Sequence, residues 1–583
     1  MMPRFTLLAA LAAWAFAADP DGAALFNSRC AVCHRDQPDG RAPSRGEVAA
    51  MPPPAVANML LQGHLTTQAA SLSQEEVRAI ASYVTGKRVS LATVRGTANK
   101  CTVNKPFNPG AGDWNGWGVD PVNSRFQPQP GFAAADVPKL RLKWAFGFPG
   151  DSIAVAQPAL VGARVFVGST SGIVYSLDAA TGCAYWTYNV GAIARTAIVI
   201  QRGVAYFGDA AAYTHAIDAL TGRLIWKVKM DDYPVARLTA APTFYNGRLY
   251  VPVSSGEELS SSAPKYECCK FRGSIVAVDA ASGRVIWKTY SIPDNAKQYK
   301  TLADGTRLFG PAGAAIWNSP TIDAKRKRLY VGTGNSYTGI EIPTSDAIAA
   351  FELDTGGLLW VNQITPRDNW VPGCPNGPRC PEVHGDDYDF GASPILVTVN
   401  GRDMLLAGQK SGVVYGLDPD QRGKLVWLTR LGQGSGFLGG VTWGMAVEGS
   451  MVFAAIADYN VRGGTPGLYA LRIADGQKLW SAPHPATGRF AAEISAVSAM
   501  PGVAFSSSYD GHLRAYSTNR GEIVWDFNAV REFDSVNRVA TKGGSFNGGG
   551  PAISRGLVVT TSGFGYAGGQ AGNALLTFSV EGK

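Results

Sequence analysis

A Cys-x-x-Cys-His motif lies close to the N-terminus, in the stretch CAVCHRD at residues 30–36. Two thiols three positions apart can form thioether bonds to the two vinyl groups of a haem, and the adjacent histidine can supply the proximal nitrogen to the iron. The motif therefore predicts a covalent haem c on Cys30, Cys33 and His34. A redox-active or zinc-binding cysteine pair is the alternative.

The second axial ligand of this haem is less clearly marked. Small c-type cytochromes usually take a methionine from the loop before the last helix, but here that loop, residues 60–73, has none. His64 is its only strong ligand, so we expect His64, with Met59, Met51 or an open site as alternatives. Two histidine ligands would give a lower reduction potential than a histidine and a methionine.

Two helices are expected to enclose the haem. One leads into Cys30, and the other covers residues 73–87, with Ser73 as N-cap and two glutamates in its first turn. The apolar face of the second helix consists of Val77, Ile80, Ala81 and Val84. We therefore expect residues 18–88 to form a small all-α cytochrome c domain.

The first 17 residues have the pattern of a cleavable secretion signal. Arg4 precedes an apolar run at residues 5–14, and Ala15-Phe16-Ala17 forms a small-residue cleavage site. We therefore expect a periplasmic protein, in a compartment where disulfides can form.

From residue 113 to residue 583 the chain repeats a pattern of strands and turns. Each unit ends in a glycine-bearing turn and a strand that contains a tryptophan: Trp186, Trp226, Trp287, Trp360, Trp427, Trp480 and Trp525. Units of about 40 residues or more predict a β-propeller, whose blades bury their faces against neighbouring blades. Trp144 and the final strands at 557–580 are expected to form an eighth blade that closes the ring. The expected fold is an all-β eight-bladed propeller at 113–583, joined by a linker at 89–112 to the N-terminal all-α cytochrome c domain.

Composition excludes two classes of function. The 583 residues contain no internal apolar run that approaches the roughly 20 residues needed to span a bilayer, so we do not expect an integral membrane protein. The net charge of +8 is spread thinly along the chain, which is not the clustered basic pattern of a nucleic-acid-binding protein.

The recurring turn Asp-x-x-[Ser/Thr]-Gly-x-x-x-Trp, over about residues 113–580, resembles the propeller of the alcohol dehydrogenases that depend on pyrroloquinoline quinone (PQQ). The haem motif ahead of it and the runs GDWNGWG, ECCKFRGS and GDDYDFGASP resemble most closely the branch of cytochrome-containing polyvinyl alcohol dehydrogenases. The resemblance implies PQQ, haem c and a calcium ion, with a lanthanide as the alternative metal.

The resemblance also assigns residues to the quinone. In SSGEEL it places Ser255 and Gly256 beside the cofactor, and in GPAGAAIWNSP it stacks Trp317 on the cofactor ring. Arg195, Thr239 and Lys410 correspond to polar contacts of the cofactor, whose three carboxylates need basic partners. A core position is the alternative for Trp317, and surface solvation is the alternative for the three polar residues.

Metal ligands and the catalytic base follow from the same resemblance. Glu258 and Asn335 (in VGTGNS) correspond to metal ligands, with Glu257 as the alternative register for the glutamate, and calcium favours such oxygen donors. Asp387, before an aromatic residue in GDDYDFGASP, corresponds to the general base and contacts the metal; Lys410 joins it in the catalytic set. Asp389 has the spacing of the additional metal ligand in lanthanide-using relatives, although Asp386 and Asp389 could be ordinary loop carboxylates.

Three cysteine pairs are expected in the propeller region. The resemblance implies a disulfide between the adjacent Cys268 and Cys269 near the quinone, although this pair follows the Glu258 loop instead of lying in an earlier blade. Economy suggests Cys374 with Cys380 and Cys101 with Cys183, with free thiols as the alternative.

The function expected from these features is alcohol oxidation in the propeller, with electrons passing through the haem to an external acceptor such as a cytochrome c. Secondary and polymeric alcohols such as polyvinyl alcohol are the expected substrates. A non-catalytic propeller scaffold of the cell envelope and a PQQ dehydrogenase for sugars or aldehydes are the alternatives.

Overall fold

The computed structural model describes residues 20–31, 34, 44–49, 51, 53, 56–57, 60, 72–87, 99–263, 265–436, 438–486, 490–566 and 568–583. The expected signal segment at 1–17, together with Cys33, Met59 and His64, lies outside the described residues.

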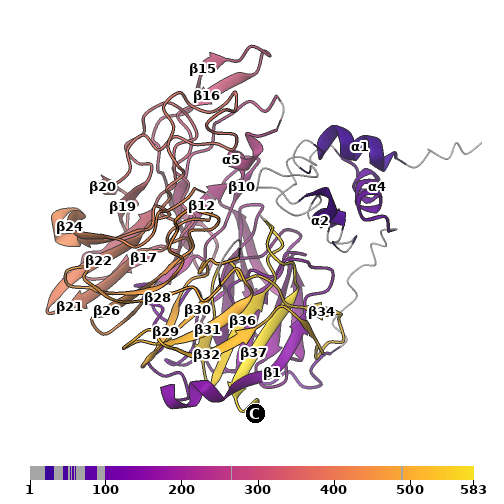
Figure 1. The fold of residues 1–583 in the computed structure, drawn as a ribbon, viewed down its shortest axis with the longest axis vertical. Coiled ribbons are helices and arrows are strands. Elements are labelled where there is room, and N and C mark those ends of the chain that lie inside the picture. Colours follow the sequence, from indigo (N-terminus) through magenta and orange to yellow (C-terminus); the bar gives the residue numbers. More distant parts are fainter. Residues whose placement is uncertain are drawn as a thin grey trace, which may run out of the picture.

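The N-terminal helices are α1 (Gly22–Arg29), α2 (Arg45–Ala49) and α4 (Gln74–Thr85), drawn in indigo in Figure 1. The predicted cap of α4 is confirmed: Ser73 and Glu76 form a reciprocal capping box. The predicted apolar face is also confirmed, because Val77, Ile80, Ala81 and Val84 are buried against Phe26 of α1 in one apolar cluster. These helices match an all-α domain.

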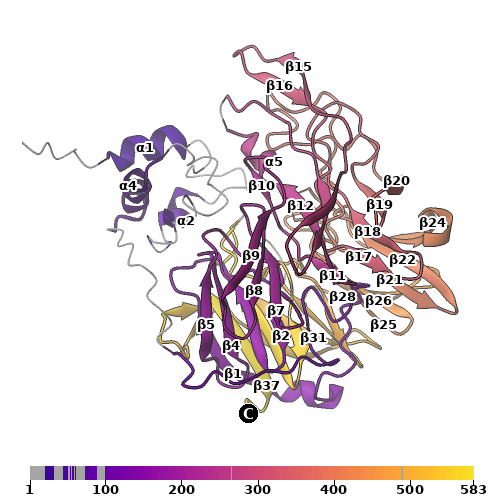
Figure 2. The ribbon, with the colours of Figure 1, turned by 180° about the vertical axis from the view of Figure 1, so that it is seen from behind.

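The remaining chain forms a ring of eight β-sheets, which confirms the predicted propeller (Figures 1 and 2). Blade 1 contains β2 (Ala159–Val161), β3 (Arg164–Gly168), β4 (Ile173–Asp178) and β5 (Ala184–Asn189). Blade 2 contains β6 (Val199–Gln201), β7 (Val204–Gly208), β8 (Tyr213–Asp218) and β9 (Leu224–Lys229). Blade 3 contains β10 (Ala236–Arg237), β11 (Thr243–Tyr245), β12 (Arg248–Ser255), β13 (Ser274–Asp279) and β14 (Val285–Tyr290). Blade 4 contains β17 (Thr321–Asp323), β18 (Arg328–Gly332), β19 (Ala347–Glu352) and β20 (Leu358–Gln363).

The second half of the ring repeats this arrangement. Blade 5 contains β21 (Ile395–Val399), β22 (Arg402–Gly408), β23 (Val413–Asp418) and β24 (Lys424–Arg430). Blade 6 contains β25 (Ala446–Glu448), β26 (Met451–Ile456), β27 (Gly467–Arg472) and β28 (Lys478–Pro483). Blade 7 contains β29 (Ser498–Met500), β30 (Val503–Ser507), β31 (His512–Ser517) and β32 (Ile523–Asn528). Blade 8 combines β35 (Ala552–Ser554), β36 (Leu557–Ser562) and β37 (Ala574–Val580) with the early strand β1 (Leu140–Gly147).

Blade 8 closes the ring as the sequence predicts. Strand β1 pairs antiparallel with β37, from Leu140 opposite Val580 to Gly147 opposite Ala574. The first strand of the propeller therefore completes its last sheet, which covers both edges that an open ring would expose.

The blade tryptophans connect neighbouring blades. Seven of the eight donate the indole N–H to a main-chain carbonyl of the next blade, as Trp427 does to Ile473 at 2.9 Å and Trp525 does to Leu140 at 3.0 Å. The ring of the eighth, Trp360, packs closely against Gly423, because a Cβ added to that glycine would lie only 2.6 Å from the ring. The tryptophans thus contribute packing between blades, as expected.

A segment at residues 121–127 crosses the inner strands of four blades. Its main chain hydrogen-bonds in turn to Ile322 of β17, Leu396 of β21, Val447 of β25 and Ala499 of β29. Within it, the fully buried guanidinium of Arg125 donates to the carbonyls of Val497 and Gly549, both at 2.6 Å. This segment fixes the relative positions of blades 4 to 8.

Several short elements lie outside the eight blades. They are the 3-10 helices η1 (Ala134–Lys139) and η2 (Pro419–Gln421), the helix α5 (Glu257–Ser260), and two hairpins, β15 (Lys297–Thr301) with β16 (Arg307–Gly310) and β33 (Glu532–Phe533) with β34 (Thr541–Lys542). The β15–β16 hairpin projects beyond α5, at the top of Figure 1. Among the described helices, none is long and apolar enough to cross a membrane.

Candidate active site

Asp387 lies in the long loop between β20 and β21. A second acid, Asp368, shapes this loop by accepting hydrogen bonds from the main-chain N–H groups of Asp387 (2.9 Å) and Tyr388 (2.5 Å). Asp387 itself has a left-handed backbone, with φ of 64°, a conformation that aspartate adopts more readily than most non-glycine residues. The loop therefore directs a buried carboxylate toward the residues that follow β22.

Lys410 follows β22 and pairs with this carboxylate. Its Nζ lies 2.8 Å from Oδ2 of Asp387 and 3.5 Å from Oδ2 of Asp389, and all three side chains are buried. Burial raises the pKa of the Asp387 carboxyl well above its usual range; Asp389 and Glu258 add to this, and Lys410 opposes it. Burial lowers the pKa of Lys410, but the charges of Asp387, Asp389 and Glu258 outweigh it and raise the pKa overall. Lys410 is therefore a permanent cation next to a carboxylate with a high proton affinity.

Asp389 connects the acidic cluster to two other predicted site residues. Its Oδ1 accepts the main-chain N–H of Asn335 at 2.7 Å, and its Oδ2 accepts the indole N–H of Trp317 at 3.1 Å. The Asn335 amide N donates to the carbonyls of Ser336 and Trp370, which leaves its side-chain oxygen for another partner. Asp389 is thus more than an ordinary loop carboxylate, because it holds both neighbours in place.

The oxygen donors of this cluster fit a hard cation. The Oδ1 of Asp387 is buried and has no hydrogen-bond partner among the described residues, and Glu258 is close enough to act on the charges of Asp387 and Lys410. No three carboxylate, histidine or cysteine side chains in the described part of the chain form a metal cage by themselves. A cation here would therefore use the Asn335 amide oxygen together with the carboxylates, a mixed set that suits calcium.

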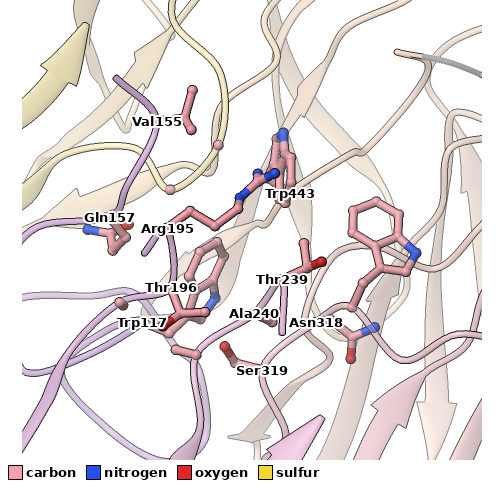
Figure 3. Close-up of a pocket in the computed structure, with 16 residues that line it drawn as sticks. Trp117, Val155, Gln157, Arg195, Thr196, Thr239, Ala240, Asn318, Ser319 and Trp443 are labelled. Carbon is pink, nitrogen blue, oxygen red and sulfur yellow. The ribbon is translucent and has the colours of Figure 1, made fainter. Parts of the chain in front are cut away.

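Trp317 also lines a pocket at the axis of the ring. Figure 3 labels Arg195, Thr239 and Trp443 among the other residues that line this pocket. Its indole ring packs directly over Gly391, where a Cβ would lie 1.8 Å from the ring, and it meets Trp443 edge-on with 5.4 Å between ring centroids. Thr239 and Arg195 line the same pocket. The ring of Trp317 lines the pocket, and its N–H bonds to the acidic cluster. This residue therefore connects the two.

Arg195 places a half-buried positive charge at this pocket. Its guanidinium carbon lies 5.1 Å from the ring centroid of Trp443 (Figure 3), and no ion pair forms with it in the described part of the chain. Burial, together with the nearby charge of Arg237, lowers the pKa of Arg195 to about 10. Two guanidinium groups that act on each other's charge would be favoured by a bound anion.

Arg237 is a further candidate site residue that no sequence signal marks. It lies at the end of β10, and its Nη2 would be only 1.9 Å from a Cβ on Gly256. Any side chain at position 256 would therefore displace this guanidinium from where it now lies. Ser255 ends β12 and accepts the main-chain N–H of Glu257 at 3.2 Å, so both residues predicted beside the quinone lie at the edge of the site.

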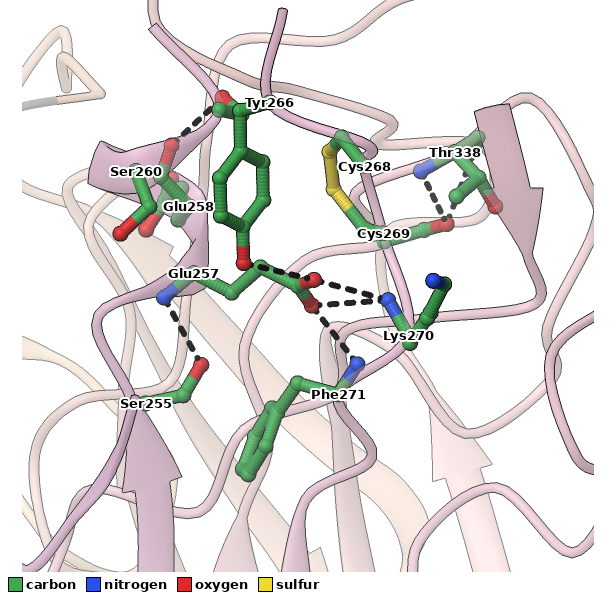
Figure 4. The surroundings of a disulfide bond; sticks show 12 residues. Ser255, Glu257, Glu258, Ser260, Tyr266, Cys268, Cys269, Lys270, Phe271 and Thr338 are labelled. Atoms are coloured by element: carbon green, nitrogen blue, oxygen red, sulfur yellow. Dashed lines mark hydrogen bonds between the residues drawn. A yellow bond between two sulfur atoms is a disulfide. The ribbon is translucent and has the colours of Figure 1, made fainter. Parts of the chain in front are cut away.

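The two adjacent glutamates have different surroundings. Glu257 is fully buried and accepts hydrogen bonds from the main chain of Lys270 and Phe271, so it is committed to its own neighbours (Figure 4). Glu258 is half-buried and acts on the charges of Asp387 and Lys410. This arrangement supports Glu258 over Glu257 as the candidate metal ligand.

All three expected disulfides are present: Cys101–Cys183, Cys268–Cys269 and Cys374–Cys380. The vicinal pair is buried, and it shares an apolar cluster with Ala315 and Tyr337, against which Trp317 packs. Despite its shifted position in the sequence, the pair therefore lies in the apolar cluster against which Trp317 packs.

Two acids near the cluster were also not expected. Asp346 is fully buried, and neither carboxylate oxygen has a hydrogen-bond partner among the described residues. Burial and the charges of Asp368, Asp389 and Asp387 raise its pKa well above the usual range. Burial likewise raises the pKa of Asp368. Only the folding of loops that are distant in sequence brings these acids together, so no local motif could have identified them.

The predicted haem residues are only partly described. Cys30 ends α1, and its carbonyl accepts the main-chain N–H of His34 at 3.1 Å, so the two ends of the motif lie close together. Met51 packs in the apolar cluster of the helices. The choice among His64, Met59 and Met51 stays a prediction.

Comparison with known families gives matches to both parts of the chain. The family model described as "Glucose/ethanol/alcohol dehydrogenase, beta-propeller domain" matches residues 114–430, and that described as "Cytochrome C oxidase, cbb3-type, subunit III" matches residues 17–84. The model described as "Outer membrane protein assembly factor BamB" matches residues 344–526, which is about a third of the chain.

Two curated relatives span nearly the whole chain. Polyvinylalcohol dehydrogenase from Pseudomonas sp is 42% identical and covers 97% of this chain and 94% of its own length. Polyvinylalcohol dehydrogenase from Sphingopyxis sp. is 38% identical, with coverage of 97% and 93%. Among solved structures, quinohemoprotein alcohol dehydrogenase from Comamonas testosteroni has the same fold, with a TM-score of 0.61 at 20% identity over 81% of each chain.

The chain belongs to the PQQ-dependent alcohol dehydrogenases that carry a cytochrome domain, an oxidoreductase family close to the polyvinyl alcohol dehydrogenases.

Proposed function

We propose that this protein oxidises secondary and polymeric alcohols, such as polyvinyl alcohol, in the periplasm and passes the electrons through its haem c to an external acceptor. The observation that carries the proposal is the double role of Trp317. Its ring lines the pocket that contains Arg195, and its N–H holds Asp389, which lies beside Lys410 and Asp387. A flat anion in the pocket would therefore end next to a base and a cation.

The chemistry of the residues in and near the pocket suits PQQ. Arg195, which lines the pocket, and Arg237, close to it, are half-buried cations that can neutralise carboxylates, and Trp317 offers an aromatic face for a planar ring. Thr239 adds a hydroxyl, and the Cys268–Cys269 disulfide lies in the apolar cluster next to Trp317. When bound there, the quinone supplies the acceptor for the hydride of the alcohol.

Asp387 and Lys410 would handle the proton. Asp387 is placed to take the hydroxyl proton of the alcohol, because burial raises the pKa of its carboxyl and so makes the carboxylate a stronger base than an exposed one. Lys410 holds Oδ2 of Asp387 at 2.8 Å, which orients the carboxylate and leaves Oδ1 for the substrate or the metal. Glu258, Asn335, Asp387 and Asp389 would hold the cation, which polarises oxygen as a Lewis acid. Calcium suits this donor set, and Asp389 adds the further carboxylate that a lanthanide would favour.

Haem reduction tests this function directly. The full-length protein is reconstituted with PQQ and either calcium or lanthanum, and the haem spectrum is followed after addition of 1-butanol, 2-butanol, glucose or polyvinyl alcohol. We expect 2-butanol and polyvinyl alcohol to reduce the haem. Asp387→Asn should abolish reduction and still bind PQQ, as judged by tryptophan fluorescence. Turnover by that variant would remove Asp387 from the mechanism.

The same experiment separates the alternatives. A non-catalytic envelope scaffold shares the propeller repeat, as the match to residues 344–526 indicates, but it would neither bind PQQ nor show haem reduction with any substrate. Reduction by glucose alone, or by an aldehyde alone, would favour a sugar or aldehyde dehydrogenase. Reduction that needs an added cytochrome c to continue would support an external acceptor.

A further inference from the structure

Glu257, the first residue of α5, is a buried carboxylate that the proposed catalysis does not use. Its Oε2 accepts the main-chain N–H groups of Phe271 at 2.7 Å and Lys270 at 3.0 Å, and its Oε1 accepts Lys270 again at 2.9 Å. The hydroxyls of Tyr233 and Tyr266 also donate to Oε1. Figure 4 shows the carboxylate pointing at this ring of donors, away from Glu258.

These donors connect two parts of the site that are separate in sequence. Glu257 lies between Gly256, beside the quinone pocket, and Glu258, a candidate metal ligand. Lys270 and Phe271 lie 13 and 14 residues after Glu257 in the chain, and they directly follow the Cys268–Cys269 disulfide. One carboxylate therefore ties the end of β12 to the segment that holds the disulfide.

The opposite side of the disulfide is held by the projecting hairpin. Phe309 of β16 donates its N–H to the carbonyl of Cys268 at 2.6 Å and accepts the N–H of Cys269 at 3.0 Å. Arg307 of the same strand pairs with Glu267 at 2.6 Å, in a contact exposed to solvent. The disulfide therefore lies between the hairpin and the segment that Glu257 holds. Of these two contacts, the one through Glu257 leads to the candidate metal ligand Glu258, its neighbour in the chain.

We propose that Glu257 is a positioning residue that fixes the Cys268–Cys269 disulfide against the quinone site and holds it in register with Glu258. The inference rests on the proposed function for the identity of the quinone. The physical basis is local: a buried carboxylate is stable only when its oxygens accept several hydrogen bonds, and here every partner within reach is a donor. Loss of the carboxylate leaves the N–H groups of Lys270 and Phe271 buried without an acceptor, so the segment after the disulfide must move.

The test compares disulfide reactivity and PQQ binding in the haem-loaded, full-length protein. Glu257→Ala removes the acceptor, whereas Tyr233→Phe removes one donor and leaves the main-chain contacts intact. Glu267→Gln is the matched control, because it removes a glutamate that anchors the same disulfide segment from the solvent side. Reduction of each disulfide by a phosphine is timed by alkylation and mass spectrometry, and the dissociation constant for PQQ is measured by tryptophan quenching.

We expect Glu257→Ala to speed reduction of Cys268–Cys269 by about tenfold or more and to weaken PQQ binding by about tenfold, which corresponds to about 1.4 kcal/mol. Tyr233→Phe and Glu267→Gln should change both quantities less than threefold. The Cys374–Cys380 disulfide reports general loosening, and its reduction rate should stay unchanged in every variant. Wild-type reduction rates and wild-type PQQ affinity in Glu257→Ala would overturn the proposal, as would equal acceleration at both disulfides.

Two further comparisons ensure that the experiment can contradict the proposal. If Glu257→Ala does not fold, Glu257→Gln replaces it, because an amide keeps one acceptor oxygen and should accelerate reduction of Cys268–Cys269 by at least about threefold. If the wild-type protein binds no PQQ, the proposed function fails, but the reduction rates in the quinone-free protein still decide whether Glu257 positions the disulfide.

Discussion

The candidate site contains more buried carboxylates than buried cations. Asp346, Asp387 and Asp389 are buried around one buried cation, Lys410, with Glu258 and Asp368 nearby. Carboxylates this close cannot all remain ionised in a poorly hydrated environment unless further positive charge arrives. The cluster therefore favours a bound cation, bound protons, or both.

Removing the charge of Lys410 should affect both catalysis and stability. Lys410→Met leaves Asp387 and Asp389 without their shared cation, and breaking a buried ion pair in this way costs about 3–5 kcal/mol of unfolding free energy. We expect the rate of haem reduction to fall by about 100-fold or more, because the orientation of the base is lost. Stopped-flow spectroscopy and thermal unfolding measure the two effects. Lys410→Arg keeps the charge and should lose much less stability; an equal loss would mean that the charge is unimportant.

The buried carboxyl of Asp151, outside the candidate site, should make the stability of the protein depend on pH. Burial raises its pKa to about 7, against the opposing hydrogen bonds from Ser171 and Thr170. Between the ordinary carboxyl pKa and about 7 the folded protein keeps a proton that the unfolded chain has lost, so the free energy of unfolding falls as the pH rises through this window. Each pKa unit corresponds to about 1.4 kcal/mol.

Asp151→Asn should remove this contribution. The amide oxygen can still accept the N–H of Thr170, which now donates at 3.0 Å, so the fold has no other reason to change. We expect the variant to gain stability relative to wild type at pH 8 and to differ little at pH 4. Denaturant unfolding at both values measures this, and an identical difference at the two pH values would contradict the assignment.

At the scale of elements, each blade depends on contact between a tryptophan and the turn of the next blade. Trp427 of β24 lies over Gly476, in the turn between β27 and β28. A Cβ on Gly476 would lie 2.4 Å from the indole ring, and this glycine has a φ of +71°. The position therefore excludes side chains for two reasons, backbone conformation and space.

Two glycine variants separate these reasons. Gly449 has a φ of +57° in the turn between β25 and β26, but a Cβ added to it would meet no atom within 4 Å. Gly449→Ala should therefore show only the backbone cost, about 1 kcal/mol. Gly476→Ala should cost at least about 2 kcal/mol more, because the ring of Trp427 must move. Equal losses in thermal unfolding experiments would show that the tryptophan contact is adaptable.

For the whole molecule, the site exists only while the ring is closed. Arg195 follows blade 1, Glu258 follows β12 of blade 3, and Lys410 follows β22 of blade 5, so no single blade contains a functional site. The pairing of β1 with β37 holds the first and last blades together.

Removing the last strand should therefore abolish cofactor binding without touching a site residue. Deletion of residues 574–583 exposes the edges of β1 and β36, and we expect loss of PQQ binding together with aggregation. Deletion of residues 581–583 alone keeps β37 paired up to Val580 and should leave PQQ binding intact. Gel filtration and tryptophan quenching compare the two proteins. A monomeric, PQQ-binding protein after the longer deletion would show that closure is dispensable.

The sequence by itself determined the architecture, because each blade repeats its own local signals. Strand periodicity, the glycine turn and the tryptophan recur in every unit, and Ser73 and Glu76 mark the start of α4. Family motifs also identified Asp387, Lys410, Asn335 and Trp317, each in a short run of characteristic residues.

Only the tertiary structure decided which of these residues meet and what else joins them. Arg237, Asp346 and Asp368 carry no motif, and they enter the site because blades and loops distant in sequence converge at the axis of the ring. The choice between Glu257 and Glu258 likewise depended on partners 13 and 14 residues away. Charge and hydrogen bonding act through space, so a linear pattern specifies the strands but not the cluster that those strands assemble.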